Sequence, residues 1–398
     1  MRISEIRVIH ARIPLKTRVR HASHSRQEND TLLIRCRMDD GSCGWGEGLP
    51  RHYVTGETIE TVWQQLQNYD FRLLGQKFDD PATLQQLAAA ISFSRPPGTR
   101  ACFGHAARCA LELSILDAGC RCLQIPLSTF IQNLPAAREL KQNANAVYYS
   151  AILTAASQWK TRLRSWMYRY YGFHQCKVKV GIPGADDLQS LMLIHRILGP
   201  QVQLRIDANE AWSPQEVIHK MRSLSSIPLQ SVEQPVPHTH VGTLQKLRRE
   251  ISVPIMLDES LCSLEDADRA IGDELCDAFN LRLSKCGGIL TTVELARQAQ
   301  QAELAFQLGC QVGETGILSA AGRHFATSIR GLTAVEGSFD RLLVKEPLTR
   351  EDLTFQREGR GVRLSGNGLG ITVHEAAVQR VTVRNLVFNL QESGSRAS

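Results

Sequence analysis

The chain lacks the Cys-x-x-Cys pairs that are typical of zinc and redox sites, although it has 11 cysteines in 398 residues. Scattered cysteines in apolar stretches, such as Cys109, argue against a zinc site or a disulfide framework and predict buried free thiols. The chain also lacks an apolar run of about 20 residues, which a membrane span needs, and the apolar core of a signal peptide. We therefore expect a cytoplasmic protein with no membrane partner.

A large charge of one sign is also missing, since the net charge is +6 at pH 7. The basic residues between Lys160 and Arg169 fit the solvated face of one helix better than a nucleic-acid patch. With 43% hydrophobic and 22% charged residues, the composition is typical of a globular enzyme. We expect no nucleic-acid partner. A small-molecule carboxylate suits the mildly positive charge, and we also expect a homo-oligomer.

Strand-like and helix-like segments alternate through the second half of the chain. Residues 1–125 contain strands followed by helices and predict an α+β capping domain, in which a loop with His21 and His24 could act as a lid. Residues 145–347 predict an α/β fold, a (β/α) barrel of TIM type. Residues 360–390 contain three short strand-like runs, at 362–364, 370–373 and 381–388, and the polar residues 391–398 predict a disordered tail. We place the eight barrel strands near Val147, Lys177, Leu204, Ser231, Ile255, Phe279, Ala305 and Leu332.

Three acidic residues each end an apolar, strand-like run. They are Asp207, Glu233 and Asp258, separated by 26 and 25 positions, which is the length of one strand, loop and helix. Carboxylates at the ends of successive parallel strands converge on the catalytic face of a barrel. Three hard oxygen donors without Cys or His suit one divalent cation, Mg²⁺, with Mn²⁺ as a substitute. We predict a metal site at these residues.

The flanking strands place cationic side chains on the same face. Side chains alternate along a strand, so Lys177 and Lys179 share a face, as do Arg205 and Asp207. The apolar residues between them, such as Val178, would face the surrounding helices. On the sixth strand the same rule directs Arg282 into the site.

These residues, together with Glu233-Gln234-Pro235, Asp258-Glu259-Ser260 and Gly287-Gly288, resemble the enolase superfamily. The resemblance is to its muconate-lactonizing subgroup (mandelate racemase/muconate lactonizing enzyme), which also contains dipeptide epimerases and o-succinylbenzoate synthases. Residues 44–58 resemble the capping loop region of that family. The resemblance implies that C-terminal segments return to complete the cap. It also implies abstraction of the α-proton of a carboxylate substrate through an enediolate.

We predict that Lys179 is the general base, the role that the resemblance gives to the second lysine of Lys-x-Lys. The ammonium of Lys177 beside it, and a nearby metal ion, would lower the pKa of at least one of the two lysines. A lysine close to neutrality accepts a proton at pH 7. The remaining candidates are residues that would support the metal or the base, or contact the substrate. They are Asn209, Glu259, Glu314, Arg51 and Tyr53.

Arg282 departs from the pattern of the resembled subgroup, which has a second lysine at this point of the sixth strand. Arginine keeps its proton and is a poor base, although it is a good fixed cation for an enediolate. Lys285 has the opposite parity, and we predict that it is directed away from the site. It remains an alternative second base if it turns inward.

One lysine facing an arginine suits lactonisation or syn elimination better than epimerisation, which needs a proton donor and acceptor on opposite faces of the carbon. The segment from Glu336 to Asp340 also lacks the Asp-x-Asp that dipeptide epimerases carry. We therefore expect a muconate cycloisomerase-like isomerase or a carbon–oxygen lyase such as o-succinylbenzoate synthase. Dipeptide or N-acylamino acid epimerases and racemases, and a catalytically impaired ligand-binding barrel, are the alternatives.

Overall fold

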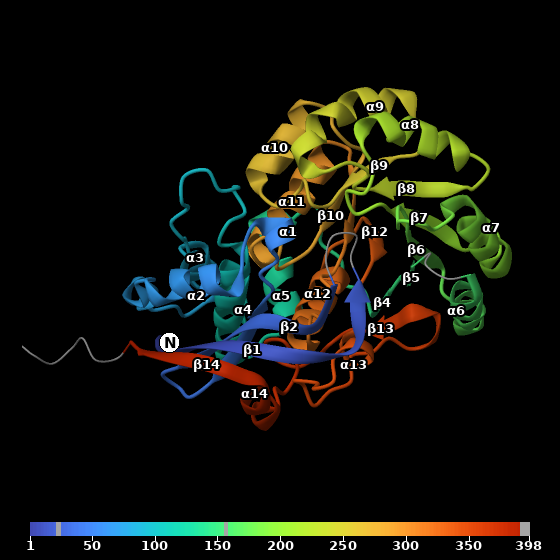
Figure 1. Ribbon diagram of the computed structural model, residues 1–398. Helices are drawn as coiled ribbons and strands as arrows, with labels where there is room; N and C mark the ends of the chain where they lie inside the picture. Colours follow the sequence, from blue (N-terminus) through green and yellow to red (C-terminus); the bar gives the residue numbers. More distant parts are fainter. Residues whose placement is uncertain (21–24, 155–157, 391–398) are drawn as a thin grey trace, which may run out of the picture.

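The structure is a computed structural model that describes residues 1–20, 25–154 and 158–390. An antiparallel sheet with helices on one side lies against an eight-stranded parallel barrel (Figure 1). The predicted lid with His21 and His24, and the predicted tail 391–398, lie outside the described residues. No helix in the described ranges is long and apolar enough to cross a bilayer.

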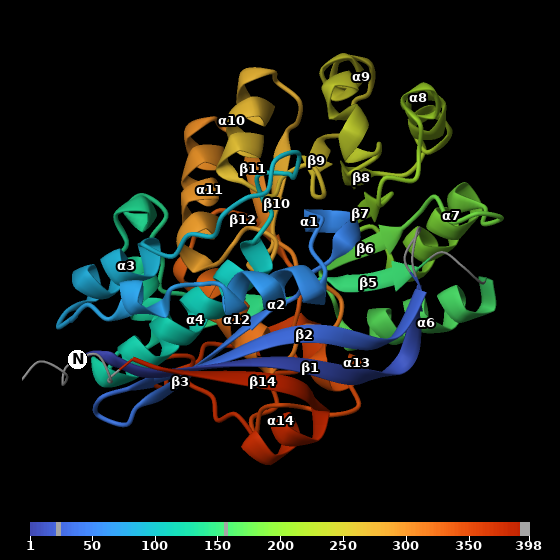
Figure 2. The ribbon, with the colours of Figure 1, turned by 60° about the vertical axis from the view of Figure 1, so that its left-hand side comes forward.

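The cap sheet joins the two ends of the chain, with strand order β14-β1-β2-β3 (Figure 2). It is built from β1 (Ile3–Arg20), β2 (Ser25–Met38), β3 (Cys43–Gly48) and β14 (Thr382–Asn389). β14 runs antiparallel to β1, with Glu5 opposite Asn389 and Val8 opposite Leu386. The C-terminal return that the resemblance implied is thus a strand of the cap.

Glycines on one face of β3 let the long helix α4 (His105–Cys122) lie directly on the strand. A Cβ on Gly44, Gly46 or Gly48 would stand 2.1, 1.9 or 2.0 Å from backbone atoms of α4. Cβ atoms do not come that close to a backbone, so the alternating glycines set how near the helix can approach the sheet.

Short helices complete the cap around α4. Thr58 and Thr61 form a reciprocal capping box at the start of α2, and Asp80 accepts the Thr83 N–H at the start of α3. The elements are α1 (His52–Thr55), α2 (Ile59–Gln67), η1 (Phe71–Leu74), α3 (Pro81–Ala89), α5 (Leu127–Gln132) and η2 (Pro135–Ala137).

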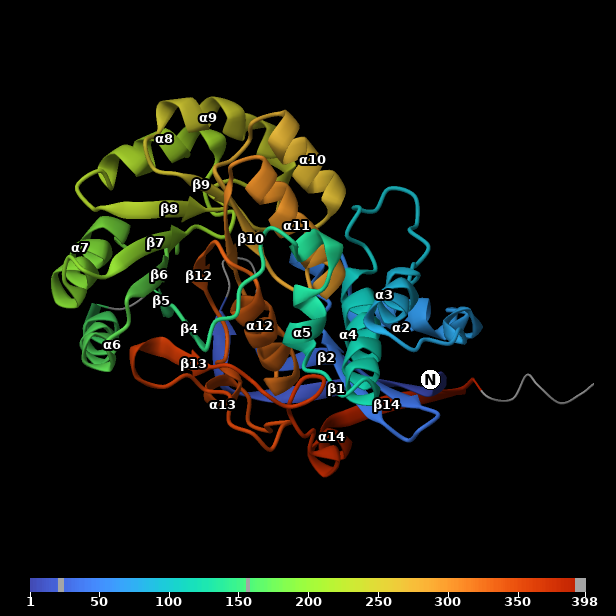
Figure 3. The ribbon, with the colours of Figure 1, turned by 180° about the vertical axis from the view of Figure 1, so that it is seen from behind.

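The barrel sheet has the order β12-β11-β10-β9-β8-β7-β6-β5, with helices on its outside (Figure 3). Ser150 N donates to Val335 O at 2.8 Å, which closes the sheet between the first strand and the last. This confirms the predicted barrel fold with a separate cap. The strands are β5 (Ala151–Thr154), β6 (Gln175–Lys179), β7 (Gln203–Asp207), β8 (Leu229–Glu233), β9 (Ile255–Leu257), β10 (Ala278–Leu281), β11 (Ala305–Leu308) and β12 (Leu332–Val335). The helices are α6 (Gln158–Tyr171), α7 (Asp187–Leu198), α8 (Pro214–Ser223), η3 (His238–Thr243), α9 (Leu244–Glu250), α10 (Leu264–Gly272), α11 (Ile289–Gln301) and α12 (Gly316–Ser328).

Two strand predictions are wrong. Val147 lies in β4 (Ala146–Tyr148), which pairs antiparallel with β13 (Arg360–Val362) in a separate two-stranded sheet, so the first barrel strand is β5. The segment 370–373 forms only an isolated bridge, between Val373 and Thr349. The C-terminal region also contains α13 (Asp340–Leu343), η4 (Arg357–Gly359) and α14 (Glu375–Val381).

The predicted free thiols are confirmed, because all 11 cysteines are unpaired and most are buried. One continuous hydrophobic core links the cap sheet, α4 and the barrel. The cap and the barrel therefore share one core.

Candidate active site

Parallel register brings the acidic strand ends together. Lys179 is level with Asp207 across β6 and β7, and Asp207 is level with Glu233 across β7 and β8. Asp258 directly follows β9, the next strand of the sheet. All three carboxylates are buried at the carboxyl end of the barrel.

Lys177 is held by three carboxylates inside the barrel. Its Nζ lies 2.7 Å from Glu336 Oε2, 3.3 Å from Glu233 Oε1 and 3.5 Å from Asp207 Oδ2. Burial alone would lower the pKa of Lys177, but these carboxylates outweigh it and raise the pKa above its ordinary value. Lys177 is therefore not a lysine with a lowered pKa, and it stays cationic.

Lys179 has a different environment. Its Nζ donates to Asn209 Oδ1 at 3.0 Å, and within the described residues no carboxylate pairs with it. Asn209 has a left-handed backbone, with φ of +44°, a conformation that asparagine tolerates. Its N–H donates to Asp207 Oδ1 at 3.0 Å, so Asn209 links Lys179 to the acidic cluster.

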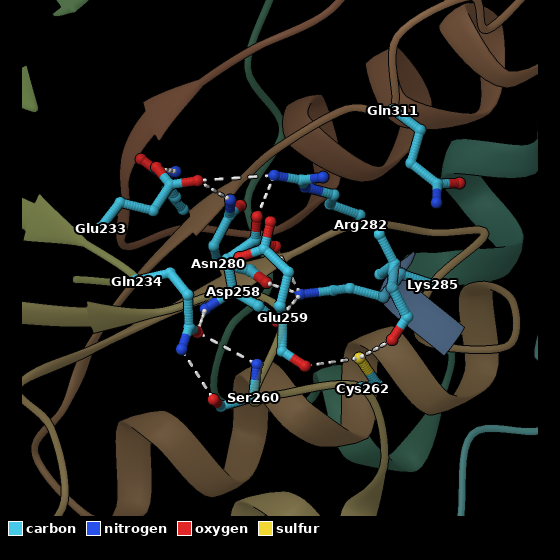
Figure 4. Close-up of polar contacts among 12 residues, drawn as sticks. Glu233, Gln234, Asp258, Glu259, Ser260, Cys262, Asn280, Arg282, Lys285 and Gln311 are labelled. Carbon is cyan, nitrogen blue, oxygen red and sulfur yellow. Dashed lines mark hydrogen bonds and ion pairs between the residues drawn. The ribbon is translucent and has the colours of Figure 1, made fainter. Parts of the chain in front are cut away.

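Arg282 stands among the acids. Its Nη2 donates to Asp258 Oδ2 and lies 3.5 Å from Glu233 Oε1 (Figure 4). Burial would lower the pKa of Arg282, but Asp258, Glu259 and Glu233 raise it well above its ordinary value. Arg282 follows β10, four places from β6 in the eight-stranded sheet, so it approaches from the side of the barrel opposite Lys179.

The prediction that Lys285 is directed away from the site is wrong. Lys285 is fully buried, and its Nζ donates to Asp258 Oδ1 at 2.9 Å, Asp258 O at 2.8 Å and Asn280 O at 2.7 Å (Figure 4). Strand parity does not apply here because β10 ends at Leu281 and the chain then turns, with Cys286 N donating to Arg282 O at 2.8 Å. All three ammonium hydrogens have acceptors, so Lys285 anchors Asp258.

The pKa of Asp258 shows the effect of these two cations. Burial would raise it, but Arg282 and Lys285 outweigh burial and hold the pKa of Asp258 well below its usual range. Glu233 behaves in the opposite way, because burial and then the charge of Asp207 raise its pKa to about 7. Burial and the charge of Asp258 raise the pKa of Glu259 well above its ordinary value.

The predicted metal ligands have the oxygen chemistry that a hard divalent cation prefers, but they do not fit one as they stand. In the described part of the chain, no three His, Cys, Asp or Glu side chains form a group that could hold a metal ion. Lys177 lies between Asp207 and Glu233, and Arg282 lies between Glu233 and Asp258. Asp207 Oδ2 is the ligand oxygen that lacks a hydrogen-bond donor among the described residues.

The remaining candidates lie around this cluster. Asn209 Nδ2 is 3.5 Å from Glu259 Oε1, and both residues are buried. Glu314 accepts the Gln311 N–H at 2.6 Å, and burial raises the pKa of Glu314 to about 8.

The two cap candidates are tied to other cap residues. Arg51 donates to Asn29 Oδ1 at 2.5 Å and to Pro50 O at 2.7 Å, and Arg26 donates to the Tyr53 hydroxyl at 3.2 Å. Both terminal nitrogens of Arg51 therefore donate hydrogen bonds within the cap, and these bonds connect its loops.

Sequence reasoning missed the roles of Glu336 and Arg205. Glu336 binds Lys177, and its Oε1 lies 3.2 Å from Arg205 Nη1, which also bonds Gln307. The sequence did contain a signal for Glu336, because this acid directly follows β12 just as Asp258 directly follows β9. These residues form a network of polar contacts that reaches Glu233 through Lys177.

Glu47, also missed, joins the cap to the barrel. Its carboxylate accepts Thr315 N at 2.8 Å, Thr315 Oγ1 at 2.7 Å and Leu318 N at 3.0 Å, at the start of α12. A carboxylate at a helix N-terminus satisfies N–H groups that have no partner within the helix.

The chain is similar to known proteins in both sequence and structure. N-succinyl-L-Arg/Lys racemase from Bacillus cereus is 25% identical over 386 residues, covering 96% of this chain and 98% of that protein. The crystal structure of the racemase superposes with a TM-score of 0.85, at 24% identity over 98% of this chain and all of the other.

Two further solved structures share the fold. The dipeptide epimerase from Cytophaga hutchinsonii, complexed with Mg and the dipeptide D-Ala-L-Val, has a TM-score of 0.82 at 23% identity, over 98% of this chain and 100% of the other. The muconate lactonizing enzyme from Pseudomonas fluorescens, complexed with muconolactone, has a TM-score of 0.82 at 23% identity, over 96% of this chain and 99% of the other. The family described as "Enolase C-terminal domain-like" matches residues 160–377, more than half of the sequence. The chain therefore belongs to the enolase superfamily.

Proposed function

We propose that this protein abstracts the α-proton of a carboxylate substrate and passes through an enediolate, with Lys179 as the base. The observation that carries the proposal is the contrast between the lysines of β6. Lys177 is held among three carboxylates, whereas among the described residues the side chain of Lys179 is held by the neutral amide of Asn209 alone. A base must be able to release and accept a proton, and a lysine held by three carboxylates is poorly suited to that task.

The relatives favour an amino acid derivative as substrate, which was the alternative rather than the main expectation from the sequence. The curated relatives include racemases and epimerases of N-succinyl amino acids and dipeptides. Such substrates carry an amide next to the reacting carbon. Gln311, which follows β11, is buried, and its side-chain O and N both lack partners among the described residues. A carboxamide in this state matches a substrate amide, which offers one donor and one acceptor.

Cycloisomerisation or elimination is the second candidate, and Arg282 favours it. Arginine keeps its proton, so it cannot act as the second base of a two-base racemase. In either reaction Arg282 is the fixed cation that offsets the negative charge of the enediolate. Mg²⁺ or Mn²⁺ on Asp207, Glu233 and Asp258 stays a prediction, and it requires Arg282 to leave two of these carboxylates.

Hydrogen exchange in D₂O tests the proposal without knowledge of the product. N-succinyl amino acids, dipeptides and simple carboxylates are incubated with the protein, and ¹H NMR follows loss of the α-proton signal. Polarimetry then distinguishes epimerisation from exchange with retention. The proposal is overturned if no substrate in the panel exchanges, with and without added Mg²⁺.

A further inference from the structure

The acidic cluster already contains a cation that belongs to the chain. The Arg282 side chain is 90% buried, and its Nη2 contacts both Glu233 and Asp258 (Figure 4). Lys177 contacts Asp207 and Glu233, and Lys285 contacts Asp258. Each of the three carboxylates is therefore paired with at least one lysine or arginine.

Few oxygen lone pairs remain for a metal ion. Lys285 and Arg282 bind Asp258 Oδ1 and Oδ2, respectively. Glu233 Oε1 accepts from Asn280 Nδ2 at 2.8 Å, and Oε2 lies 3.3 Å from Gln307 Nε2. A magnesium ion needs close oxygen ligands at near-ideal octahedral positions. The guanidinium of Arg282 lies between Glu233 and Asp258, two of the three predicted ligands.

We propose that Arg282 is a built-in cation that occupies the position of the divalent ion and competes with it for Glu233 and Asp258. The chain would then bind divalent ions far more weakly than the same chain without this arginine. Unlike a metal ion, the guanidinium cannot be removed by a chelator, so the positive charge is a permanent part of the site.

Arg282 also has a hydrogen-bond donor that no described residue uses. Nη2 serves the two protein carboxylates, but Nε is buried and has no partner among the described residues. A guanidinium has five N–H donors in a rigid fork and binds carboxylates well. Because Nε is enclosed by the protein, a substrate carboxylate reaches this donor only after the Arg282 side chain moves.

Manganese binding tests this inference and does not depend on the reaction proposed above. Mn²⁺ is titrated into the wild-type protein and into Arg282→Met, and EPR measures the free ion. We expect the variant to bind Mn²⁺ at least 100-fold more tightly. The double variant Arg282→Met/Asp207→Asn is the control, and it should lose this gain because it removes one of the oxygen ligands.

Thermal unfolding provides a second measurement for the case in which Arg282→Met does not fold. The melting temperature of the wild type should not change with EDTA, nor with 5 mM Mn²⁺, which is about a thousandfold excess over micromolar protein. The melting temperature of Arg282→Lys should rise when Mn²⁺ is added. The inference is overturned if the wild type binds Mn²⁺ within threefold of the variants, or if EDTA lowers its melting temperature.

Discussion

Lys179 donates a hydrogen bond to Asn209 at 3.0 Å, and this neutral amide orients the lysine at the mouth of the barrel. The backbone N–H of Asn209 in turn donates to Asp207 Oδ1. The orientation of the Lys179 side chain therefore depends on the end of β7, which also carries Asp207. The position of the base and the position of the acidic cluster are thereby coupled.

Replacing Lys179 tests its role directly. Lys179→Ala should slow α-proton exchange at least 10²-fold, because a positioned general base contributes about 10²–10⁴-fold. Circular dichroism should remain unchanged, since the lysine is only half buried and its side chain makes one hydrogen bond within the described ranges. Lys246→Ala is the control, because the Lys246 side chain is 83% exposed. Exchange at a near wild-type rate in Lys179→Ala would show that another group is the base.

The two enantiomers of one substrate should behave differently. Lys179 and Arg282 approach from opposite sides of the barrel, and only the lysine can accept a proton. One enantiomer should therefore exchange its α-proton in D₂O while the other stays inert, as measured by ¹H NMR on each pure enantiomer. Equal exchange rates would require a second base. Lys285 would be the first residue to examine.

Lys285 should matter for stability more than for chemistry. Lys285→Met would remove the ammonium donor from Asp258 Oδ1 and from the carbonyl groups of Asp258 and Asn280, so we expect a loss of about 3–5 kcal/mol in the free energy of unfolding. Urea denaturation measures the loss, with Lys246→Met as the exposed control. A Lys285→Met protein of wild-type stability that no longer exchanges either enantiomer would instead point to a catalytic lysine.

His324 should make the protein less stable in mild acid. Its Nδ1 accepts Ser128 N–H at 3.2 Å and its Nε2 donates to Leu369 O at 3.0 Å, so the neutral ring is fully used. Burial lowers the pKa of His324 to about 4. An unfolded histidine has a pKa of about 6.5, so its contribution is complete above pH 6.5 and is lost as pH falls toward 4.

Urea denaturation between pH 4.5 and 7.5 measures this effect. The pKa difference corresponds to at most ~3.5 kcal/mol, at about 1.4 kcal/mol for each pKa unit. His324→Gln should reduce the slope on the acid side of the stability profile, because glutamine does not titrate. Part of the slope should remain, since burial also lowers the pKa of His105 to about 4. The exposed His219→Gln should leave the profile as in the wild type. A profile that keeps its slope in His324→Gln would contradict the assignment.

The convergence of Asp207, Glu233 and Asp258 was predictable, because each acid ends a strand and parallel strands end at the same edge. The direction of Lys285 was not, because the parity rule stops where β10 stops and a turn decides the rest. The charge state of Lys177 was equally hidden, since Glu336 lies 159 positions away in sequence. The segment around Val147 alternates like a barrel strand, but Val147 pairs with Gly361 in a separate sheet. Such a distant strand partner cannot be read from the local sequence pattern.

The pairing of β1 with β14 has a consequence for how the protein is made. Residues 382–389 leave the ribosome after every strand of the barrel, yet they form one edge of the sheet that begins with Ile3. During synthesis, β1 therefore has an open edge, which is a site for unwanted strand pairing. The cap sheet is completed only after translation has passed the barrel, so the first strand to be made is among the last to find all its neighbours.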